Sequence, residues 1–258
     1  MSDPRTTPPS GVGVARMIRR GRASLRHAPS LDAIQDNELL FGDSVTVFES
    51  KDGWALSQSA FDNYVGYVDA EAFGDPLTPD HRVIALATPL LARPDVKSAA
   101  LDMLPLNAHV KVLERSKGFV RIAPAGYVFA GHLAPPGQLA QDWVATAERF
   151  LAVPYVWGGK TFAGIDCSGL VQTALAAAGI AAPRDTDQQE AALGADCPYL
   201  ARKRGDLVFW NGHVGIMIDE TRLIHANAFH MQVEIEPLED AIARIAQIVG
   251  PVNAIKRL

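Results

Sequence analysis

The chain has 258 residues, 48% of them hydrophobic and 21% charged, which suffices for one large domain or for two to three small ones. Its formal net charge of -5 at pH 7 argues against binding to nucleic acid or to an anionic membrane, since both favour clustered positive charge. Two cysteines are too few for a disulfide scaffold, and no apolar run approaches the roughly 18 residues of a membrane-spanning helix.

Residues 1–30 are rich in Pro, Arg and Ser, and we expect them to form a poorly ordered or loosely packed arm. The basic run over residues 16–26 is interpreted as a surface segment rather than a nucleic-acid or lipid patch, because it stands alone in an acidic chain. The arm lacks the apolar central region of a secretory signal peptide. Together with the two thiols, this composition favours a cytoplasmic protein.

Short β-type runs separated by turns containing Gly, Asp or Asn begin at Leu39 and fall into two sets, over residues 31–75 and 76–134. The two sets contain similar hairpins, VTVFESKDGWALS in the first and VKVLERSKGFVRIA in the second. We expect two small antiparallel barrels or sandwiches and interpret the likeness as a duplicated module. A chance likeness between two β-hairpins is the alternative.

Residues 138–258 predict a different kind of domain, which follows a linker at residues 135–137 (PPG). Two helices come first: one carries four apolar residues at helical spacing, and the other covers residues 167–178 with Gly179 as its C-terminal cap. Strands follow at residues 207–210, 214–218, 222–225 and 233–236. Helices followed by an antiparallel sheet define an α+β domain.

Cys167 opens the second of these helices. The unpaired N–H groups and the positive end of the helix dipole favour a thiolate there, which is the form that attacks carbonyl carbon. Gly169 keeps the first turn slim, so that a substrate backbone could approach. A buried structural cysteine is the alternative. Cys197 lies in a loop with no helix after it and is expected to be inert.

His213 is the best candidate for the base, because it enters a strongly apolar strand after an Asn-Gly turn. His225 ends the next strand, and in a hairpin its ring could reach and orient His213. His230 is a weaker competitor in the following loop. A zinc site made of Cys167, His213 and His225 is the rival interpretation, but the close ligand spacings of structural zinc sites are absent. We expect neither a metal nor a cofactor.

Six segments then resemble, in order, the motifs of the NlpC/P60 cysteine peptidases. They are YVWGG at residues 155–159, DCSGLVQ at 166–172, PRDTDQQ at 183–189, GDLVF at 205–209, GHVGI at 212–216 and LIHA at 223–226. The resemblance implies a papain-like α+β domain over residues 138–258, with Cys167 as nucleophile, His213 as base and His225 as the third residue. It also implies that the upstream sets are two bacterial SH3-like barrels.

This arrangement is similar to the γ-D-glutamyl-L-diamino-acid endopeptidases of the dipeptidyl-peptidase VI type, which act in murein peptide recycling. The resemblance implies cleavage of the bond between D-Glu and a diamino acid, meso-diaminopimelate or L-Lys, in murein peptides with a free N-terminal L-Ala. The missing signal peptide agrees with such a role. An acyltransferase on the same fold, or a non-catalytic wall-binding or scaffold protein, are the alternatives. We expect a monomer.

The free amine of such a peptide needs a carboxylate and a small pocket. Asp166, beside the nucleophile, is placed to supply the charge, and Ser168 could donate to the substrate backbone. The resemblance implies further contacts from the first barrel and from the peptidase domain, at Tyr64, Asp43, Tyr155, Trp157, Asp185 and Thr186. Asp43 stands where relatives often carry Glu, and plain aromatic packing is the alternative for the three aromatic residues.

Overall fold

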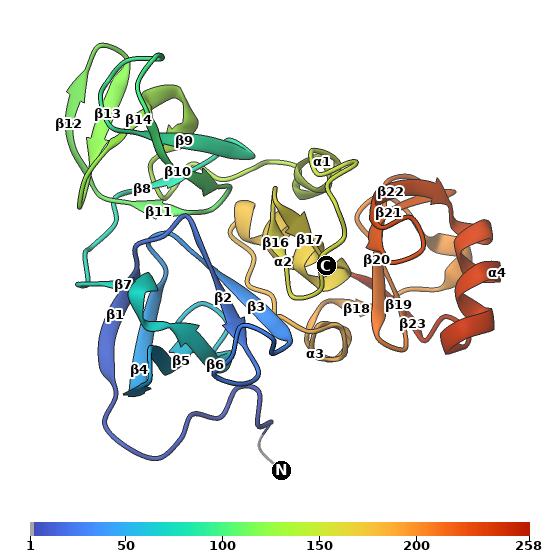
Figure 1. Cartoon of the computed structure of the whole chain (residues 1–258). Coiled ribbons are helices and arrows are strands. Elements are labelled where there is room, and N and C mark those ends of the chain that lie inside the picture. The colour runs from blue at the N-terminus through green and yellow to red at the C-terminus, as the bar shows by residue number, and fades with distance from the viewer. Residues whose placement is uncertain (1–2) are drawn as a thin grey trace. The chain divides into compact units, whose positions relative to one another are not determined.

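The computed structural model describes residues 3–258, which divide into two compact units, residues 3–138 and Leu139–Leu258. The division falls directly after the predicted linker at residues 135–137. The first unit is built from strands, and the second combines strands with helices α1, α2, α3 and α4, so the chain has the expected α+β character (Figure 1). Among the described residues, no helix is long and apolar enough to cross a membrane.

The first part of the N-terminal unit is an antiparallel sheet with the strand order β3-β2-β6-β5-β4-β1-β7. Its strands are β1 (Val14–Ile18), β2 (Arg22–Arg26), β3 (Gln35–Leu40), β4 (Ser44–Lys51), β5 (Trp54–Ser59), β6 (Val65–Asp69) and β7 (Phe73–Gly74). Side chains alternate across the sheet, which brings Ile18, Leu25, Leu39 and Val68 into one hydrophobic cluster.

The expectation of a loose arm over residues 1–30 is wrong for residues 14–26, which form two strands, and residues 1–2 lie outside the described residues. Strand β1 pairs with β4 and β7, and β2 pairs with β3 and β6. Met17, Ile18 and Leu25 are buried. The arginine-rich composition concealed short apolar positions that reach the core once the chain is extended, because neighbouring side chains in a strand point to opposite faces.

The second part of this unit contains a sheet with the order β10-β9-β14-β13-β12 and a smaller one with the order β11-β8-β15. The strands are β8 (His81–Val83), β9 (Ala87–Leu91), β10 (Ala100–Pro105), β11 (His109–Val110), β12 (Val112–Ser116), β13 (Phe119–Ile122), β14 (Tyr127–Phe129) and β15 (Leu133–Ala134). A second hydrophobic cluster lies between them.

The two parts of the N-terminal unit meet at Phe41, the residue after β3. Phe41 is 1% exposed and belongs to the second cluster, together with Leu104 and Ile122. Its carbonyl accepts the N–H of His109 at 2.8 Å. The next residue, Gly42, has a φ of +84°, and a Cβ there would collide with the carbonyl oxygen of His109. The close approach therefore requires glycine.

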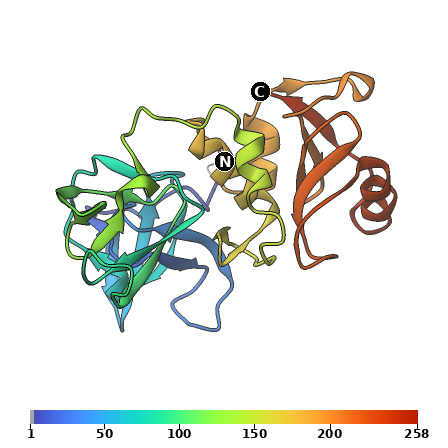
Figure 2. The same cartoon turned by 90° about the horizontal axis from the view of Figure 1, so that it is seen from above.

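The C-terminal unit holds an antiparallel sheet with the order β18-β23-β19-β20-β21-β22. Helix α2 lies on one side of this sheet and α4 on the other (Figures 1 and 2). The elements are α1 (Trp143–Glu148), β16 (Lys160–Thr161), β17 (Gly164–Ile165), α2 (Cys167–Ala177), α3 (Thr186–Ala192), β18 (Ala195–Asp196), β19 (Leu207–Trp210), β20 (His213–Met217), β21 (Arg222–Asn227), β22 (Gln232–Pro237), α4 (Leu238–Val249) and β23 (Ala254–Arg257).

Helix α2 begins at Cys167 as predicted, and Gly179 follows its end with a φ of +77°, as a C-terminal glycine does. Helix α1 is shorter than its apolar pattern suggested, because Asp142 caps it at Trp143 and leaves Leu139 outside. The sequence analysis did not predict α3, α4 or β23. Helix α4 covers the sheet through Leu238, Ala241 and Ile245.

Candidate active site

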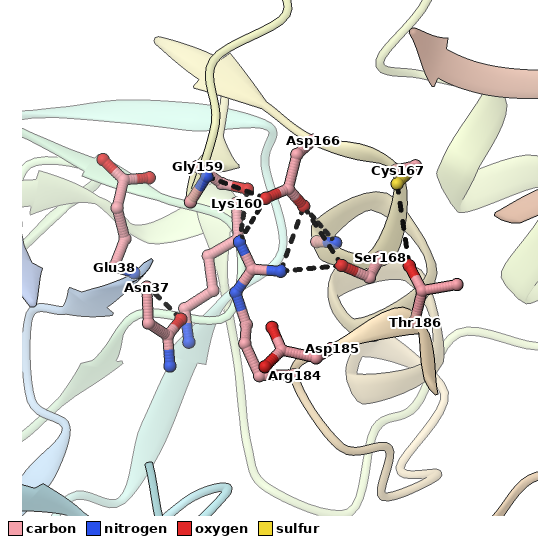
Figure 3. A network of polar contacts seen from close by, with 12 residues as sticks. Asn37, Glu38, Gly159, Lys160, Asp166, Cys167, Ser168, Arg184, Asp185 and Thr186 are labelled. Atoms are coloured by element: carbon pink, nitrogen blue, oxygen red, sulfur yellow. Dashed lines mark hydrogen bonds and ion pairs between the residues drawn. The ribbon is translucent and has the colours of Figure 1, made fainter. Parts of the chain in front are cut away.

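Cys167 occupies the first position of α2 and is 7% exposed. Its sulfur lies 3.8 Å from Oγ1 of Thr186, the first residue of α3 (Figure 3). The backbone N–H groups of Ser168 and Val214 also face the sulfur. Since Val214 follows His213 at the start of β20, the thiol and the predicted base are at the same end of that strand.

A buried ion pair holds the start of α2. Arg184 is 1% exposed and binds Asp166 with both ends of its guanidinium, at 3.0 Å to Oδ1 and 2.6 Å to Oδ2 (Figure 3). Asp166 is the N-cap of α2 and accepts the N–H of Gly169 at 2.7 Å. It also accepts the N–H of Gly158 at 2.8 Å. One carboxylate therefore ties the segment before the nucleophile to the helix that carries it.

These contacts bear on the expectations for Asp166 and Gly169. Asp166 was expected to bind a substrate ammonium, but Ser168 Oγ at 3.4 Å is a fifth donor to a carboxylate with about four acceptor sites. Its charge is matched by Arg184 in this structure, and its contact with a substrate ammonium stays a prediction. Gly169 was expected to make room for substrate. A Cβ there would instead collide with the Gly159 carbonyl and lie 2.9 Å from Asp166 Oδ1, so its missing side chain admits the 157–159 segment.

Burial of the Cys167 thiol acts against the thiolate that the sequence led us to expect at this helix start. Burial raises the pKa of this thiol to about 11, and the negative charge of Asp166 acts in the same direction. The N–H groups of Val214 and Ser168 and the hydroxyl of Thr186 oppose this shift without reversing it. The helix terminus is therefore outweighed by desolvation, and the nucleophile needs a base.

The two predicted histidines are joined in a hydrogen-bonded chain. His213 Nε2 lies 2.8 Å from His225 Nδ1, and His225 Nε2 lies 2.6 Å from Glu236 Oε1. Glu236 is also paired with Arg244 of α4. Strands β20, β21 and β22 lie next to one another in the sheet, so the chain runs across three neighbouring strands. The predicted contact between His213 and His225 is present.

Burial favours the neutral form of both histidines. Burial lowers the pKa of His213 to about 3, and His225 and Arg244 contribute in the same direction. Burial also lowers the pKa of His225, although the hydrogen bond with Glu236 opposes this. Burial alone would raise the pKa of Glu236, but its contacts with His225 and Arg244 keep it below the usual range. The carboxylate is thus the ionised member of the chain.

The remaining candidates of the C-terminal unit lie around Cys167. Ser168 and Thr186 are buried, and Asp185 caps α3 in a capping box with Gln188. Burial raises the pKa of Tyr155, as do the nearby Cys167 and Asp166, which places this phenol beside the nucleophile. Trp157 is 62% exposed.

Tyr64 and Asp43 belong to the N-terminal unit, and both are buried there. Tyr64 is 5% exposed within the first hydrophobic cluster. Asp43 accepts the N–H of Leu40 at 2.8 Å and lies 3.6 Å from His109. These contacts show aromatic packing for Tyr64 and a turn-stabilising role for Asp43. Their predicted contacts with a substrate amine stay predictions.

Sequence reasoning missed Arg184, Glu236 and Arg244. Arg184 stands in the quoted PRDTDQQ segment, so its position was visible but its partner was not. Glu236 lies in β22 and His225 in the neighbouring β21, on the same face of the sheet, and the alternation of the two strands could have suggested the contact. Within residues 3–258, no three or more His, Cys, Asp or Glu side chains are arranged to hold a metal ion.

Residues 152–248 match the NlpC/P60 family, and residues 25–73 match the bacterial dipeptidyl-peptidase SH3 domain. The chain is 26% identical over 244 residues to dipeptidyl-peptidase 6 of Lysinibacillus sphaericus, with 84% of this chain and 89% of that protein covered. It is 26% identical over 237 residues to the gamma-D-glutamyl-L-lysine dipeptidyl-peptidase of Bacillus cereus, with 79% and 70% covered.

A crystal structure of an NlpC/P60 family protein from Bacillus cereus has the same fold, with a TM-score of 0.78 at 20% identity over 95% of this chain and 99% of that one. The C-terminal unit is therefore an NlpC/P60 domain, and an SH3-like domain precedes it. The chain therefore carries an NlpC/P60 domain of the cysteine peptidase class.

Proposed function

We propose that this peptidase hydrolyses the γ-D-glutamyl bond to a diamino acid, meso-diaminopimelate or L-Lys, in murein peptides that carry a free N-terminal L-Ala. The observation that carries the proposal is the hydrogen bond between His213 and His225. It lies at the end of β20 where the N–H of Val214, the residue after His213, faces the Cys167 thiol. The names of two relatives support the substrate, since one cleaves a gamma-D-glutamyl-L-lysine bond.

In the proposed reaction, Cys167 Sγ attacks the γ-carbonyl carbon of D-Glu while His213 takes the thiol proton. The Cys167 N–H, at the start of α2, donates to the developing oxyanion. His213 then protonates the leaving amine as the carbon–nitrogen bond breaks, which leaves a thioester. Water attacks the thioester, gives its proton to His213 and releases the free carboxylate, and the sulfur recovers its proton.

The resting pair in this proposal is a thiol and a neutral imidazole. A thiol pKa of about 11 and a histidine pKa of about 3 both oppose a preformed thiolate–imidazolium pair. Proton transfer must therefore accompany attack on the carbonyl. The charge that appears on His213 in that step is favoured by the carboxylate of Glu236, which reaches it through His225.

The substrate side of the proposal rests on the aromatic residues of the peptidase domain. Tyr155 lies beside the nucleophile, and the exposed Trp157 follows two residues later. Ser168 and Thr186 carry hydroxyl groups near the thiol, with Asp185 at the cap of α3. We propose that these residues line the position of the scissile bond. The free thiols of Cys167 and Cys197 agree with a cytoplasmic location.

The SH3-like match covers residues 25–73, and we propose that residues 76–134 form a second barrel of the same kind. The five-stranded and three-stranded sheets around one cluster support this. We further propose a monomer that acts on a soluble peptide.

The test is mass spectrometry of L-Ala-γ-D-Glu-meso-diaminopimelate after incubation with the protein, beside an N-acetylated copy and the L-Lys analogue. Cleavage of the free peptides to L-Ala-D-Glu and the diamino acid is the expected result. Equal cleavage of the acetylated copy would keep the peptidase and contradict the free-amine requirement. If no peptide is cleaved, the proposed substrate is wrong.

A transferase remains the second candidate, because a thioester can pass its acyl group to an amine as well as to water. Addition of a free amino acid to the same incubation separates the two. A new amide in the product spectrum would indicate transfer, whereas hydrolysis gives the free dipeptide alone.

A further inference from the structure

The chain of side chains behind His213 does not end at the predicted third residue. His225 is fully buried, and its second ring nitrogen contacts Glu236, a carboxylate that the proposed mechanism has so far used only as a charge. Arg244 reaches the same oxygen of Glu236 from α4. The guanidinium of Arg244 in turn lies over the ring of Phe229, 4.3 Å from its centroid. Glu236 is therefore held in place from two sides.

The ionised carboxylate sets the direction of every hydrogen bond in this chain. Glu236 can only accept, so the nitrogen of His225 that faces it, Nε2, must carry hydrogen. A neutral imidazole has one N–H, so Nδ1 of His225 accepts. His213 must then donate from Nε2, which leaves the lone pair on its Nδ1. A single tautomer follows for each ring.

We propose that Glu236, fixed by Arg244, is a positioning residue that selects the tautomer of both histidines and so makes Nδ1 of His213 the basic atom. This inference rests on the proposed role of His213 and deepens it. Without the carboxylate, His225 has no obligatory acceptor at Nε2, and both rings can reverse. In the reversed chain Nε2 of His213 accepts from His225, and the lone pair on Nδ1 is lost.

The same strand provides a matched control. Glu234 lies two residues before Glu236 on the same face of β22, and its Cα is the register partner of His225. Its carboxylate nevertheless accepts from Gln232 Nε2 at 2.9 Å. Glu234→Gln and Glu236→Gln therefore remove the same charge from neighbouring positions, and only the second touches the histidine chain.

The first experiment measures the hydrolysis kinetics of both variants. We expect Glu236→Gln to lower kcat by about 10- to 100-fold with little change in KM, because orienting partners of reactive histidines have effects of that size. Glu234→Gln should keep the kcat and KM of the parent. Equal kinetics for the two variants, or a loss confined to KM, would overturn the inference.

The second experiment reads the tautomers directly and does not depend on any substrate. In protein labelled with nitrogen-15 at histidine, the two ring nitrogens give different shifts, and His213→Gln and His225→Gln identify the signals. The parent and Glu234→Gln should show His213 protonated at Nε2 alone. Glu236→Gln should show mixed protonation. An unchanged tautomer in Glu236→Gln would refute the inference even if the proposed substrate proved wrong.

A double-mutant cycle separates positioning from a general structural effect. Since Glu236 acts through His225, adding Glu236→Gln to His225→Gln should cause no further fall in kcat. A full additional 10- to 100-fold loss in that background would show that Glu236 acts by another route, and the inference would then fail.

Discussion

Both halves of the active site are supported by a carboxylate paired with an arginine, but they use the pair differently. Behind the nucleophile, Asp166 and Arg184 are almost completely buried, and they act on the backbone at the start of α2. Behind the base, Glu236 and Arg244 are partly exposed, and they reach the reactive histidine through another ring. The first pair holds the backbone at the start of α2. The second, in our proposal, sets which ring nitrogens of His213 and His225 carry hydrogen.

The difference teaches that equal charge pairs do not predict equal effects. A buried pair that fills all acceptor sites of its carboxylate contributes mainly to stability, since breaking it leaves an uncompensated charge in the core. An ion pair at the edge of the core contributes less to the free energy of unfolding. The Glu236–Arg244 pair acts instead by fixing the hydrogen bond between Glu236 and His225.

The largest expected effect is a loss of activity when either Cys167, on the nucleophile side, or His213, on the base side, is replaced. Cys167→Ala and His213→Ala should each lower kcat/KM by at least about 10³-fold, and the double variant should be no worse than either single one, because the two groups act as a unit. Peptide hydrolysis checks this, with Cys197→Ala as a control that keeps full activity. Additive losses would show that the nucleophile and the base work independently.

The next effect separates the two ion pairs by stability. Arg184→Met leaves the buried Asp166 without its partner and should lower the free energy of unfolding by about 3–5 kcal/mol. Urea unfolding measures it. The control is Arg222→Met, whose partner Asp219 is exposed in the same unit, and the expected loss there is about 1 kcal/mol or less. Similar losses in both variants would contradict the division of roles.

A third effect concerns alkaline pH and the nucleophile side. The pKa of Cys167 is about 11 in the folded protein, against an ordinary value of 9.0. Between these values the unfolded chain has lost the proton that the folded chain keeps, so the free energy of unfolding falls as pH rises. Cys167→Ala should show a smaller fall over this range in urea titrations. Parallel curves for the two proteins would contradict the raised pKa.

The base side gives the opposite sign. The pKa of His213 is about 3 in the folded protein, below the ordinary 6.5, so the unfolded chain binds the proton first as pH falls. The free energy of unfolding should therefore decrease from about pH 6.5 towards pH 3, and His213→Ala should weaken that decrease. The same titrations, extended to acid, measure it. An identical acid dependence would show that His213 can take a proton without cost.

The smallest effect lies outside both halves. Trp157→Ala should change the free energy of unfolding by about 0.5 kcal/mol or less, because the ring is mostly exposed. If the ring contacts the substrate as proposed, KM should rise by about 3- to 10-fold with kcat little changed. A loss of stability instead would identify Trp157 as a packing residue.

The sequence predicted the placement of the candidate reactive residues better than the groups around them. The position of Cys167 at a helix start and the contact between His213 and His225 were predicted because helix starts and adjacent strands can be read from local patterns. The buried contacts of Asp166 and Gly169 were not predicted. Their neighbours are set by the packing of separate segments, and a charge in a sequence does not reveal its partner 18 residues away.

The prediction of a loose N-terminal arm failed for a related reason. Its composition pointed to disorder, but Ile18 and Leu25 join strands whose partners come later in the chain. Strand pairing is a long-range property, so a short apolar segment among arginines carries little signal by itself. The pKa of Cys167 could not be predicted either, because it depends on burial that only the fold provides.

Phe41 limits how such chains can be recombined. Its side chain belongs to the core of the part that follows, and Gly42 permits the close approach to His109. A chimera that replaces residues 14–74 with another module would leave a void in its neighbour unless the new module supplied a large aromatic residue followed by glycine. Such a void costs about 3–5 kcal/mol. The two N-terminal modules are therefore inherited or transplanted most safely as one piece.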